Sequence, residues 1–396
     1  MIESQGQWIG ETSYPGQMKR LLAESAKLIG CAPDDLEVGV LAADWLNISR
    51  YVAATGDENP LYLNPLYGAE SWWRTQLAPP GFVLSIMVPE SAGALYSGRY
   101  DAVERLSAIE ILWNDHIKLG ERVSAHGRFA QAIPVSADLE SDGVDAVTQV
   151  VYRSEHRAIA WARGRVTVKP VQSGSQPVAP REMHEYEPHE IESLEAALEA
   201  ESSPRGRVPR FHSDVKIGEP LPLTTRGPIT WSELQTWMVA EGRNAPAGNI
   251  RHRDLLKSPG NIRPHAATSW PVSDRRQARE DLLCCRDVGF PAPCARGAMI
   301  VALATQNITA WMGDGAFVRR IEMSLPAPVL YGDTLTLESR VIDKFEQRIS
   351  KNRYFGVTID VTVRNQVGES VAFGTVLVYL PNNGCPVELP VEEEMF

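Results

Sequence analysis

The sequence predicts an α+β fold built from two tandem copies of one unit, each a long central helix wrapped by a curved antiparallel sheet. The first observation behind this prediction is an internal repeat. "IEILWNDHIKLGERV", which starts at Ile109, aligns without a gap on "IEMSLPAPVLYGDTL", which starts at Ile321, at an offset of 212 residues. The second observation is that each copy carries an apolar helical stretch followed by several strand patterns.

The repeat extends well beyond these two segments. The same offset carries Trp161 of "AIAWARGRVTV" onto Phe373 of "SVAFGTVLVYL". A second pair, "VAATGDENP" ending at Pro60 and "MVAEGRNAP" ending at Pro246, aligns at an offset of 186, so the second copy has gained a loop, which we place at 249–286. We therefore predict four parts: a first unit over 1–170, a linker with an acidic helix over 171–210, a second unit over 211–383 and an acidic tail over 384–396.

The predicted helix of the second copy, "RGAMIVALATQNITAWMG" from Arg296 to Gly313, is apolar on most faces. A helix that is apolar all round is a buried one. In the first copy "PPGFVLSIMVPESAGAL" takes the same place, with Pro89 limiting or bending the helix. Stretches such as "DTLTLESRVIDKF", "YFGVTIDVTVRNQ" and "ESVAFGTVLVYLP" alternate or run apolar at strand length, so strands are expected after the helix.

The linker has Ser-, Pro- and Gly-rich ends, which are typical of an irregular connection. Its middle, from Pro188 to Glu201, carries acids on most positions and apolar residues at helical spacing, namely Ile191, Leu194 and Leu198. We expect a surface helix lying across the fused unit. The alternative is a helix that docks a partner protein.

Composition and charge limit the class of protein. The chain of 396 residues is 43% hydrophobic and 22% charged, ordinary for a soluble globular protein, and its net charge of −11 argues against nucleic acid as a partner. No apolar run approaches the ~20 residues that span a bilayer, and no signal peptide pattern is present, so we expect no membrane partner and a cytoplasmic location. The five cysteines are odd in number and lack CxxC spacing, which disfavours disulfides and a metal site.

One buried helix wrapped by a curved antiparallel sheet, duplicated in one chain, is the double hotdog arrangement. The stretches "ATGDENPLYLNPLYGAE" and "LAPPGFVLSI", together with "RDVGFPAPCARGAMIVALATQNITAWMGDG" in the second half, resemble the MaoC-like acyl-thioester dehydratases and hydratases. The resemblance covers about 40–165 and 225–381. The corresponding turn of that family reads G-D-x-N-P-x-H-x-D.

The resemblance implies a hydro-lyase acting on a 2-enoyl or 3-hydroxyacyl thioester. It implies no cofactor besides the coenzyme A or phosphopantetheine that carries the acyl group, on a free thioester or a carrier protein, and a homodimer or a hotdog hetero-oligomer. Asp57 and Asn59 match the family's polar turn and would be catalytic. The backbone amides near Gly81 and Phe82, just after Pro80, would bind the thioester carbonyl, because the first N–H groups of a helix have no internal partner.

The sequence departs from the family at the position of the catalytic His, which is Tyr62 here. A phenol with an ordinary pKa near ~10 is a poor proton acceptor at neutrality. Asp57 could act alone if burial raised its pKa. The second copy supplies no imidazole either, whether Arg243 or Arg279 is aligned with this turn. The remaining predicted substrate-binding residues are Trp72, Gly297 and His265, the last a substitute imidazole from the enlarged loop.

Three functions remain open from the sequence. The first is hydration or dehydration of an acyl thioester by Asp57, Asn59 and Tyr62. The second is another reaction on a repurposed hotdog, such as cyclisation or isomerisation. The third is a non-catalytic acyl-binding subunit of a hotdog complex. A structural alternative also stands for the motif itself, because Asp and Asn side chains commonly bond their own backbone in turns.

Overall fold

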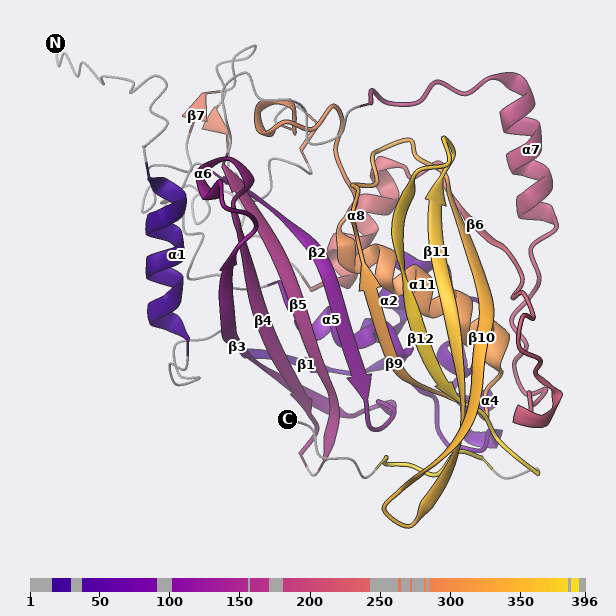
Figure 1. Ribbon diagram of the computed structural model, residues 1–396. Helices are drawn as coiled ribbons and strands as arrows, with labels where there is room; N and C mark the ends of the chain where they lie inside the picture. The colour runs from indigo at the N-terminus through magenta and orange to yellow at the C-terminus, as the bar shows by residue number, and fades with distance from the viewer. Residues whose placement is uncertain are drawn as a thin grey trace, which may run out of the picture.

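The computed structural model describes residues 16–29, 38–90, 102–155, 157–170, 181–242, 263–264, 271–272, 281–282, 285–383 and 386–391. Ten strands form one antiparallel sheet in the order β1-β3-β4-β5-β2-β9-β12-β11-β10-β6 (Figure 1). The first unit supplies β1 (Val38–Ala42), β2 (Ala102–Trp113), β3 (Arg122–Pro134), β4 (Val144–Arg153) and β5 (Ala158–Pro170). The second unit supplies β6 (Thr224–Arg226), β9 (Phe317–Ser324), β10 (Leu335–Ile349), β11 (Asn352–Asn365) and β12 (Ser370–Tyr379).

The two units meet at the centre of this sheet, where β2 pairs with β9. Glu110 is the register partner of Glu322, the residue to which the sequence repeat matches it. The repeat is also kept one strand further out, since Leu112 pairs with Trp161 in the first unit and Ser324 with Phe373 in the second. An approximate two-fold axis therefore passes through the middle of the sheet. The predicted α+β double hotdog fold is confirmed.

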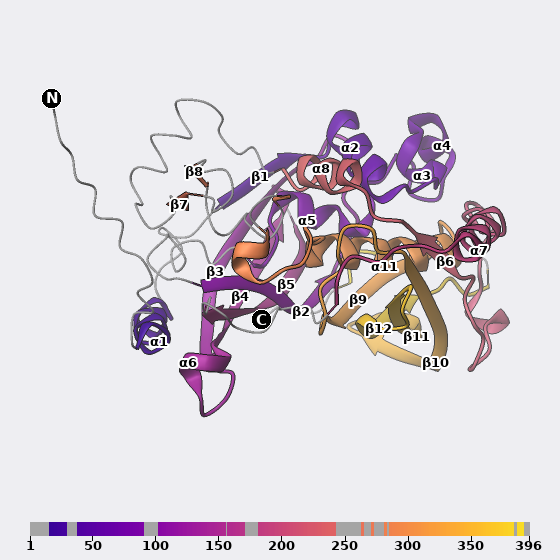
Figure 2. The same ribbon diagram turned by 90° about the horizontal axis from the view of Figure 1, so that it is seen from above.

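The helices lie mainly on one side of the sheet (Figure 2). They are α1 (Gln17–Leu28), α2 (Trp45–Thr55), α3 (Pro60–Leu63), α4 (Pro65–Glu70), α5 (Val83–Ile86), α6 (Leu139–Asp142), α7 (Pro188–Glu199), α8 (Trp231–Ala240) and α11 (Gly297–Met312). Short 3₁₀ turns are η2 (Pro80–Phe82), η3 (His212–Asp214) and η5 (Cys285–Val288), and β7 (Arg263–Pro264) pairs with β8 (Pro271–Val272). No helix in the described ranges is long and apolar enough to cross a membrane.

The central helix of the second unit, α11, has the length that the sequence predicts. Nearly all of its residues are buried, and it packs against β2, β9 and β12. It ends at Gly313, in a conformation with φ 77° that favours glycine. Because β2 belongs to the first unit, this helix contacts strands of both units.

The central helix of the first unit is much shorter than expected. Within the described residues it consists of η2 and α5, and the chain becomes extended at Met87, where φ is −162°. The proline ring disfavours the helical conformation for the residue before it, and Pro89 itself has no N–H to donate. The backbone of Pro89 instead presses on β5, where only a glycine fits: a Cβ on Gly164 would lie 2.3 Å from the Pro89 carbonyl oxygen. The expectation of a long helix holds for the second unit only.

Helices α2 and α8 are equivalent under the offset of 186 residues. Each begins with a Trp after a side-chain cap, Asp44 for α2 and Thr230 for α8. Each is followed by a left-handed glycine, Gly56 with φ 65° and Gly242 with φ 71°. The two helices pack against each other, so the approximate two-fold axis runs between them.

Two predicted segments lie largely outside the described residues. Of the enlarged loop over 249–286, the structure describes only 263–264, 271–272, 281–282 and 285–286. Of the tail over 384–396 it describes 386–391. Within the predicted linker, α7 forms at Pro188–Glu199 with Glu187 and Glu190 in a capping box, and its side chains are largely exposed.

Candidate active site

The turn that follows α2 is built by its own Asp and Asn side chains. An Asp57 oxygen accepts a hydrogen bond of 2.9 Å from the N–H of Asn59, and the Asn59 side-chain oxygen accepts one of 3.0 Å from the N–H of Leu61. The second bond caps α3, whose first residue is Pro60. The D-x-N-P pattern thus fixes the local backbone, as the structural alternative expects.

The second unit holds this turn in place. The Asn59 side-chain amide donates to Asp314 at 3.2 Å, and the Tyr67 hydroxyl donates to the other Asp314 oxygen at 2.7 Å. The Gln306 amide donates to the Gly56 carbonyl at 3.0 Å. Because Gln306 lies on α11 and Asp314 just after it, the turn of one unit is fixed by the helix of the other.

Asp57 is a buried carboxyl group with a raised pKa. Only 6% of the residue is exposed. Burial raises its pKa to about 6, although the hydrogen bond from Asn59 and the positive charge of Arg226 act in the opposite direction. Such a group is partly protonated near neutrality, so it can both accept and donate a proton.

Two buried phenols accompany Asp57. Tyr51 lies on the inner face of α2, and Tyr62 lies on α3. Burial raises the pKa of both phenols well above the ordinary value, and the charge of Asp57 raises it further. Tyr62 is also in hydrogen-bonding proximity to Thr309 of α11. Both tyrosines therefore stay protonated and can act as hydrogen-bond donors beside the carboxyl group.

Tyr51 connects this cluster to the predicted carbonyl site. Its hydroxyl lies against Gly81, where a Cβ would come within 2.1 Å of the Tyr51 oxygen. Its ring packs edge-on against Phe82. The Phe82 N–H is already engaged, because it donates to the Pro79 carbonyl at 2.9 Å. The Pro80 carbonyl accepts from the Trp113 indole at 3.0 Å. The structure thus brings the start of the first helix next to the Asp57 turn.

Three other predicted substrate-binding residues are not brought into this cluster. Trp72 is 41% exposed, and its ring covers Gly315. Gly297, at the start of α11, faces apolar side chains, with Leu106 atoms 3.1 Å from the position of a Cβ. His265 lies outside the described residues.

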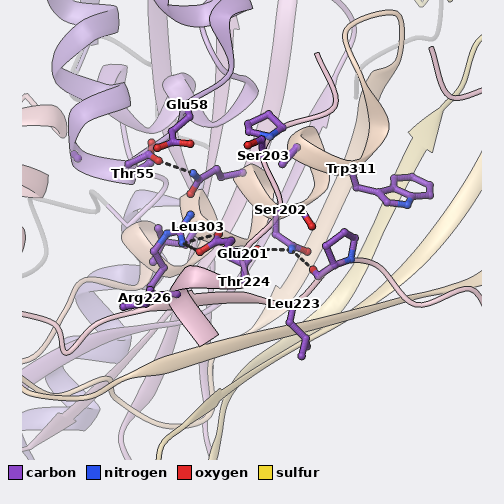
Figure 3. A pocket seen from close by; sticks show the side chains of 18 of the residues that line it. Thr55, Glu58, Glu201, Ser202, Ser203, Leu223, Thr224, Arg226, Leu303 and Trp311 are labelled. Carbon is purple, nitrogen blue, oxygen red and sulfur yellow. Dashed lines mark hydrogen bonds and ion pairs between the residues drawn. The ribbon is translucent and has the colours of Figure 1, made fainter. Parts of the chain in front are cut away.

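A pocket of about 370 Å³ lies on the other side of the Asp57 turn, between the turn, α11 and the linker (Figure 3). Gly56 and Glu58 line it, whereas Asp57 between them does not. Arg226 lines the wall and forms an ion pair of 2.8 Å with Glu201 of the linker. The α11 side of the pocket is formed by Met299, Leu303, Gln306, Asn307, Ala310 and Trp311.

The sequence alone did not single out Tyr51 or Asp314. Tyr51 has the spacing of a core residue, since Ile48, Val52 and Thr55 are buried on the same face of α2. A buried phenol that needs a partner was the available signal. Asp314 lies in a Gly-Asp-Gly sequence that indicates the end of a helix, and its contact with Asn59 is purely tertiary.

No cluster of three or more His, Cys, Asp or Glu side chains that could hold a metal ion occurs among the residues with described positions.

Comparison with known proteins supports the fold. No family model matches the chain, and no curated protein matches it in sequence. Among solved structures, a MaoC-like dehydratase is 13% identical with a TM-score of 0.60, covering 89% of this chain and 100% of its own. A Chloroflexus aurantiacus protein described as a MaoC domain dehydratase is 11% identical with a TM-score of 0.54, covering 90% of this chain and 98% of its own.

A third structure, a Mycobacterium tuberculosis protein with a double hotdog fold, is 15% identical with a TM-score of 0.52, covering 89% of this chain and 98% of its own. At such identities the likeness establishes the architecture and not the reaction. The chain has the double hotdog fold found in MaoC-like dehydratases, and the resemblance seen in the sequence is confirmed at that level.

Proposed function

We propose that this protein hydrates a 2-enoyl thioester, or dehydrates the corresponding 3-hydroxyacyl thioester, with Asp57 as the proton-transferring group. The acyl group would be carried on coenzyme A or on a phosphopantetheine arm. The observation that supports this proposal most directly is the buried Asp57 carboxyl group, with a pKa of about 6, beside two protonated phenols and the start of the first hotdog helix.

A single carboxyl group can perform both proton transfers. In hydration, ionised Asp57 accepts a proton from water as the water oxygen bonds to C3, and the electrons of the C2–C3 double bond move toward the thioester oxygen. The protonated Asp57 then delivers that proton to C2. Dehydration follows the reverse path, with the proton leaving C2 and joining the departing hydroxide. No second base is needed, which fits the replacement of the family's His by Tyr62.

We assign Asn59 and Tyr62 supporting roles in this reaction. Both ends of the Asn59 amide are engaged, with Leu61 and with Asp314, so it holds the turn instead of binding water. The Tyr62 phenol lies among Asp57, Asp314 and Thr309 and would donate a hydrogen bond to the ionised Asp57 or to the water.

The test is turnover of short- and long-chain 2-enoyl thioesters, offered as coenzyme A and pantetheine derivatives and followed by loss of the enoyl absorbance. We expect hydration by the wild type and a loss of about 10²- to 10⁴-fold for Asp57→Asn, the usual contribution of general acid–base catalysis. Glu58→Gln is the matched control, because Glu58 is adjacent but exposed. Absence of turnover on every thioester, or full activity of Asp57→Asn, contradicts the proposal.

One observation favours a second candidate function. The pocket of about 370 Å³ is bounded by both neighbours of Asp57 but not by Asp57 itself. An acyl ligand held there would bind without meeting the carboxyl group, as in an acyl-binding subunit or a hotdog with a different reaction. Tight thioester binding without turnover, weakened by Leu303→Trp in the pocket wall, would support this candidate.

A further inference from the structure

Tyr51 has no part in the proton transfers described above, yet its hydroxyl lies where the thioester carbonyl is expected. We propose that Tyr51 is a catalytic residue whose hydroxyl donates a hydrogen bond to the thioester carbonyl oxygen. The inference deepens the proposed function and rests on it for the identity of the ligand. The carbonyl-binding site would then include a side-chain donor in addition to backbone amides.

The Tyr51 hydroxyl lies against the start of the first hotdog helix. Gly81 lies in the first turn of the first hotdog helix, and a methyl group added to it would stand 2.1 Å from the Tyr51 oxygen. The hydroxyl is thus in contact with the backbone that the fold offers to a carbonyl group. The ring is held from two sides, by Phe82 at 5.9 Å and by Trp237 at 6.0 Å between ring centroids, both edge-on. A donor held this firmly needs little reorganisation during a reaction.

The state of the other donors at this helix start also favours Tyr51. The Phe82 N–H is engaged with the Pro79 carbonyl, so one of the two predicted amides cannot bind a ligand. No protein group in the described part of the chain forms a hydrogen bond with the Tyr51 hydroxyl, although the residue is only 2% exposed. The hydroxyl is thus available as a donor, and an acceptor from a ligand would complete its hydrogen bonding.

The reaction itself calls for a hydrogen-bond donor at the thioester oxygen. In both directions of the reaction, negative charge develops on the thioester oxygen while Asp57 moves a proton at C2 or at the oxygen atom on C3. A preorganised donor at that oxygen lowers the barrier. The Tyr51 phenol keeps its proton because burial and the nearby Asp57 charge both raise its pKa. It donates a hydrogen bond throughout and transfers no proton, so the balance of the reaction is unchanged.

Tyr62 does not meet the same conditions. Its phenol is near Thr309 and Asp314, groups at the far end of α11, which belongs to the second unit. The Tyr51 hydroxyl, in contrast, contacts the helix start of its own unit. The two phenols flank Asp57 with different surroundings.

The experiment uses the full chain and four variants: Tyr51→Phe, Gly81→Ala, the double variant, and Tyr354→Phe. The last removes another buried phenol on β11, far along the chain from the turn. The first readout is the carbonyl stretching frequency of bound butyryl-pantetheine labelled with ¹³C at the thioester carbon, measured by difference infrared spectroscopy. This readout needs binding but no turnover. The second readout is kcat and KM for enoyl thioester hydration.

We expect the wild type and Tyr354→Phe to lower the carbonyl frequency of the bound thioester, and Tyr51→Phe to lose that shift. We expect kcat of Tyr51→Phe to fall about 100-fold with KM little changed, the usual effect of removing one such donor. Gly81→Ala should act like Tyr51→Phe, because its methyl group displaces the hydroxyl. The double variant should be no worse than either single one, since both changes remove the same hydroxyl from the carbonyl site.

The outcomes separate the two proposals. A frequency shift in the wild type that Tyr51→Phe loses, without any turnover, supports the role of Tyr51 in carbonyl binding and contradicts the hydratase proposal. Turnover or a frequency shift that is unchanged in Tyr51→Phe overturns the inference alone. Fully additive losses in the double variant also overturn it, because they would mean that Gly81 and Tyr51 act separately. A wild type that neither binds nor converts the thioesters overturns both.

Discussion

Glu110 of β2 and Glu322 of β9 are direct partners across the central strand pair of the sheet, and Arg320 bridges them. An Arg320 nitrogen lies 2.7 Å from a Glu110 carboxylate oxygen and 2.9 Å from one of Glu322. Two like charges placed directly opposite each other in a sheet repel, and a cation between them offsets the repulsion. Arg320 therefore adds an ion-pair contribution to the seam that β2 and β9 form by strand pairing.

We expect Arg320→Ala to lower the free energy of unfolding by about 0.5–1 kcal/mol, a modest value because the groups are partly exposed. Urea denaturation measures this change. The loss should shrink in a Glu110→Gln background, where the repulsion is already removed, and it should also shrink at high salt. An equal loss in both backgrounds would show that Arg320 stabilises the seam by packing alone.

Asp57 should lower the stability of the protein at neutral pH. Its pKa is about 6 in the folded state against the ordinary 3.8. Because folding favours the protonated form, the contribution of this group to stability is full below pH about 4 and is lost as the pH rises through about 6. Asp57→Asn keeps an oxygen for the Asn59 N–H but cannot ionise. It should be more stable than the wild type at neutral pH by roughly 3 kcal/mol, with no difference below pH about 4.

The measurement is urea denaturation of the two proteins across this pH range, with Glu58→Gln as a control that alters an exposed neighbour. A stability difference that does not change with pH would mean that the Asp57 carboxyl group is not desolvated in solution.

The same pKa predicts the pH dependence of activity. Hydration requires ionised Asp57 to take a proton from water, so kcat/KM for hydration should fall as the pH drops through about 6. A pH–rate profile at limiting enoyl thioester measures kcat/KM and so reports the pKa in the free enzyme, and a profile at saturating thioester reports the pKa in the complex. A profile that stays flat between pH 5 and 8 would exclude Asp57 as the base.

Asp314 should matter for both stability and activity because it fixes the turn from the second unit. Asp314→Ala leaves the Asn59 amide and the Tyr67 hydroxyl without their acceptor, and we expect a loss of about 2 kcal/mol. Tyr67→Phe removes one of these bonds and should lose about half as much. Denaturation curves give the stabilities, and enoyl hydration by the folded variants gives the activity. If Asp314→Ala keeps wild-type turnover, the turn does not need this contact for function.

The charged cluster at the start of α11 should be the most sensitive of the ion pairs. Arg296 is buried with Glu90 and Glu241, 2.8 Å from the latter, and burial lowers its pKa to about 9. Arg296→Met removes the buried cation that both acids contact, and we expect a loss of about 3–5 kcal/mol. Arg353→Met, which breaks an exposed pair with Glu346, should lose at most about 1 kcal/mol.

Neutralising the two acids tests whether buried charge causes the loss of stability in Arg296→Met. Adding Glu90→Gln and Glu241→Gln to Arg296→Met should recover much of the stability, because no buried charge then remains. A triple variant as unstable as Arg296→Met would point to lost packing around the long arginine side chain.

The repeat was visible in the sequence because equivalent positions of the two units have the same structural role. The offset that matches Glu110 with Glu322 also matches Gly120 with Gly332, and both glycines have φ 86°. Similarly, α11 was predictable because a helix buried on all sides must be apolar throughout. Its counterpart α5 ends at Ile86, shortly before Pro89, the residue that the sequence indicated would limit or bend it, although the resulting length was not predicted.

The candidate site was predictable only where its residues are close in sequence. Asp57, Asn59 and Tyr62 belong to one motif, and the structure places them on one turn. Tyr51 and Asp314 join that turn through contacts between segments that are distant in sequence. The sequence alone indicates a core residue of a helix for Tyr51 and the end of a helix for Asp314. A local pattern of this kind predicts burial or the end of a helix, but it does not predict which side chain of a distant segment will be in contact.

The contact between Tyr51 and Trp237 has an evolutionary consequence. These residues occupy equivalent positions of α2 and α8 under the offset of 186, and their rings lie 6.0 Å apart beside the approximate axis. In an ancestral dimer of identical chains, such a position could only meet its own copy, phenol on phenol or indole on indole. Because both copies belong to one chain here, the two positions can carry different residues, a phenol and an indole that pack edge-on.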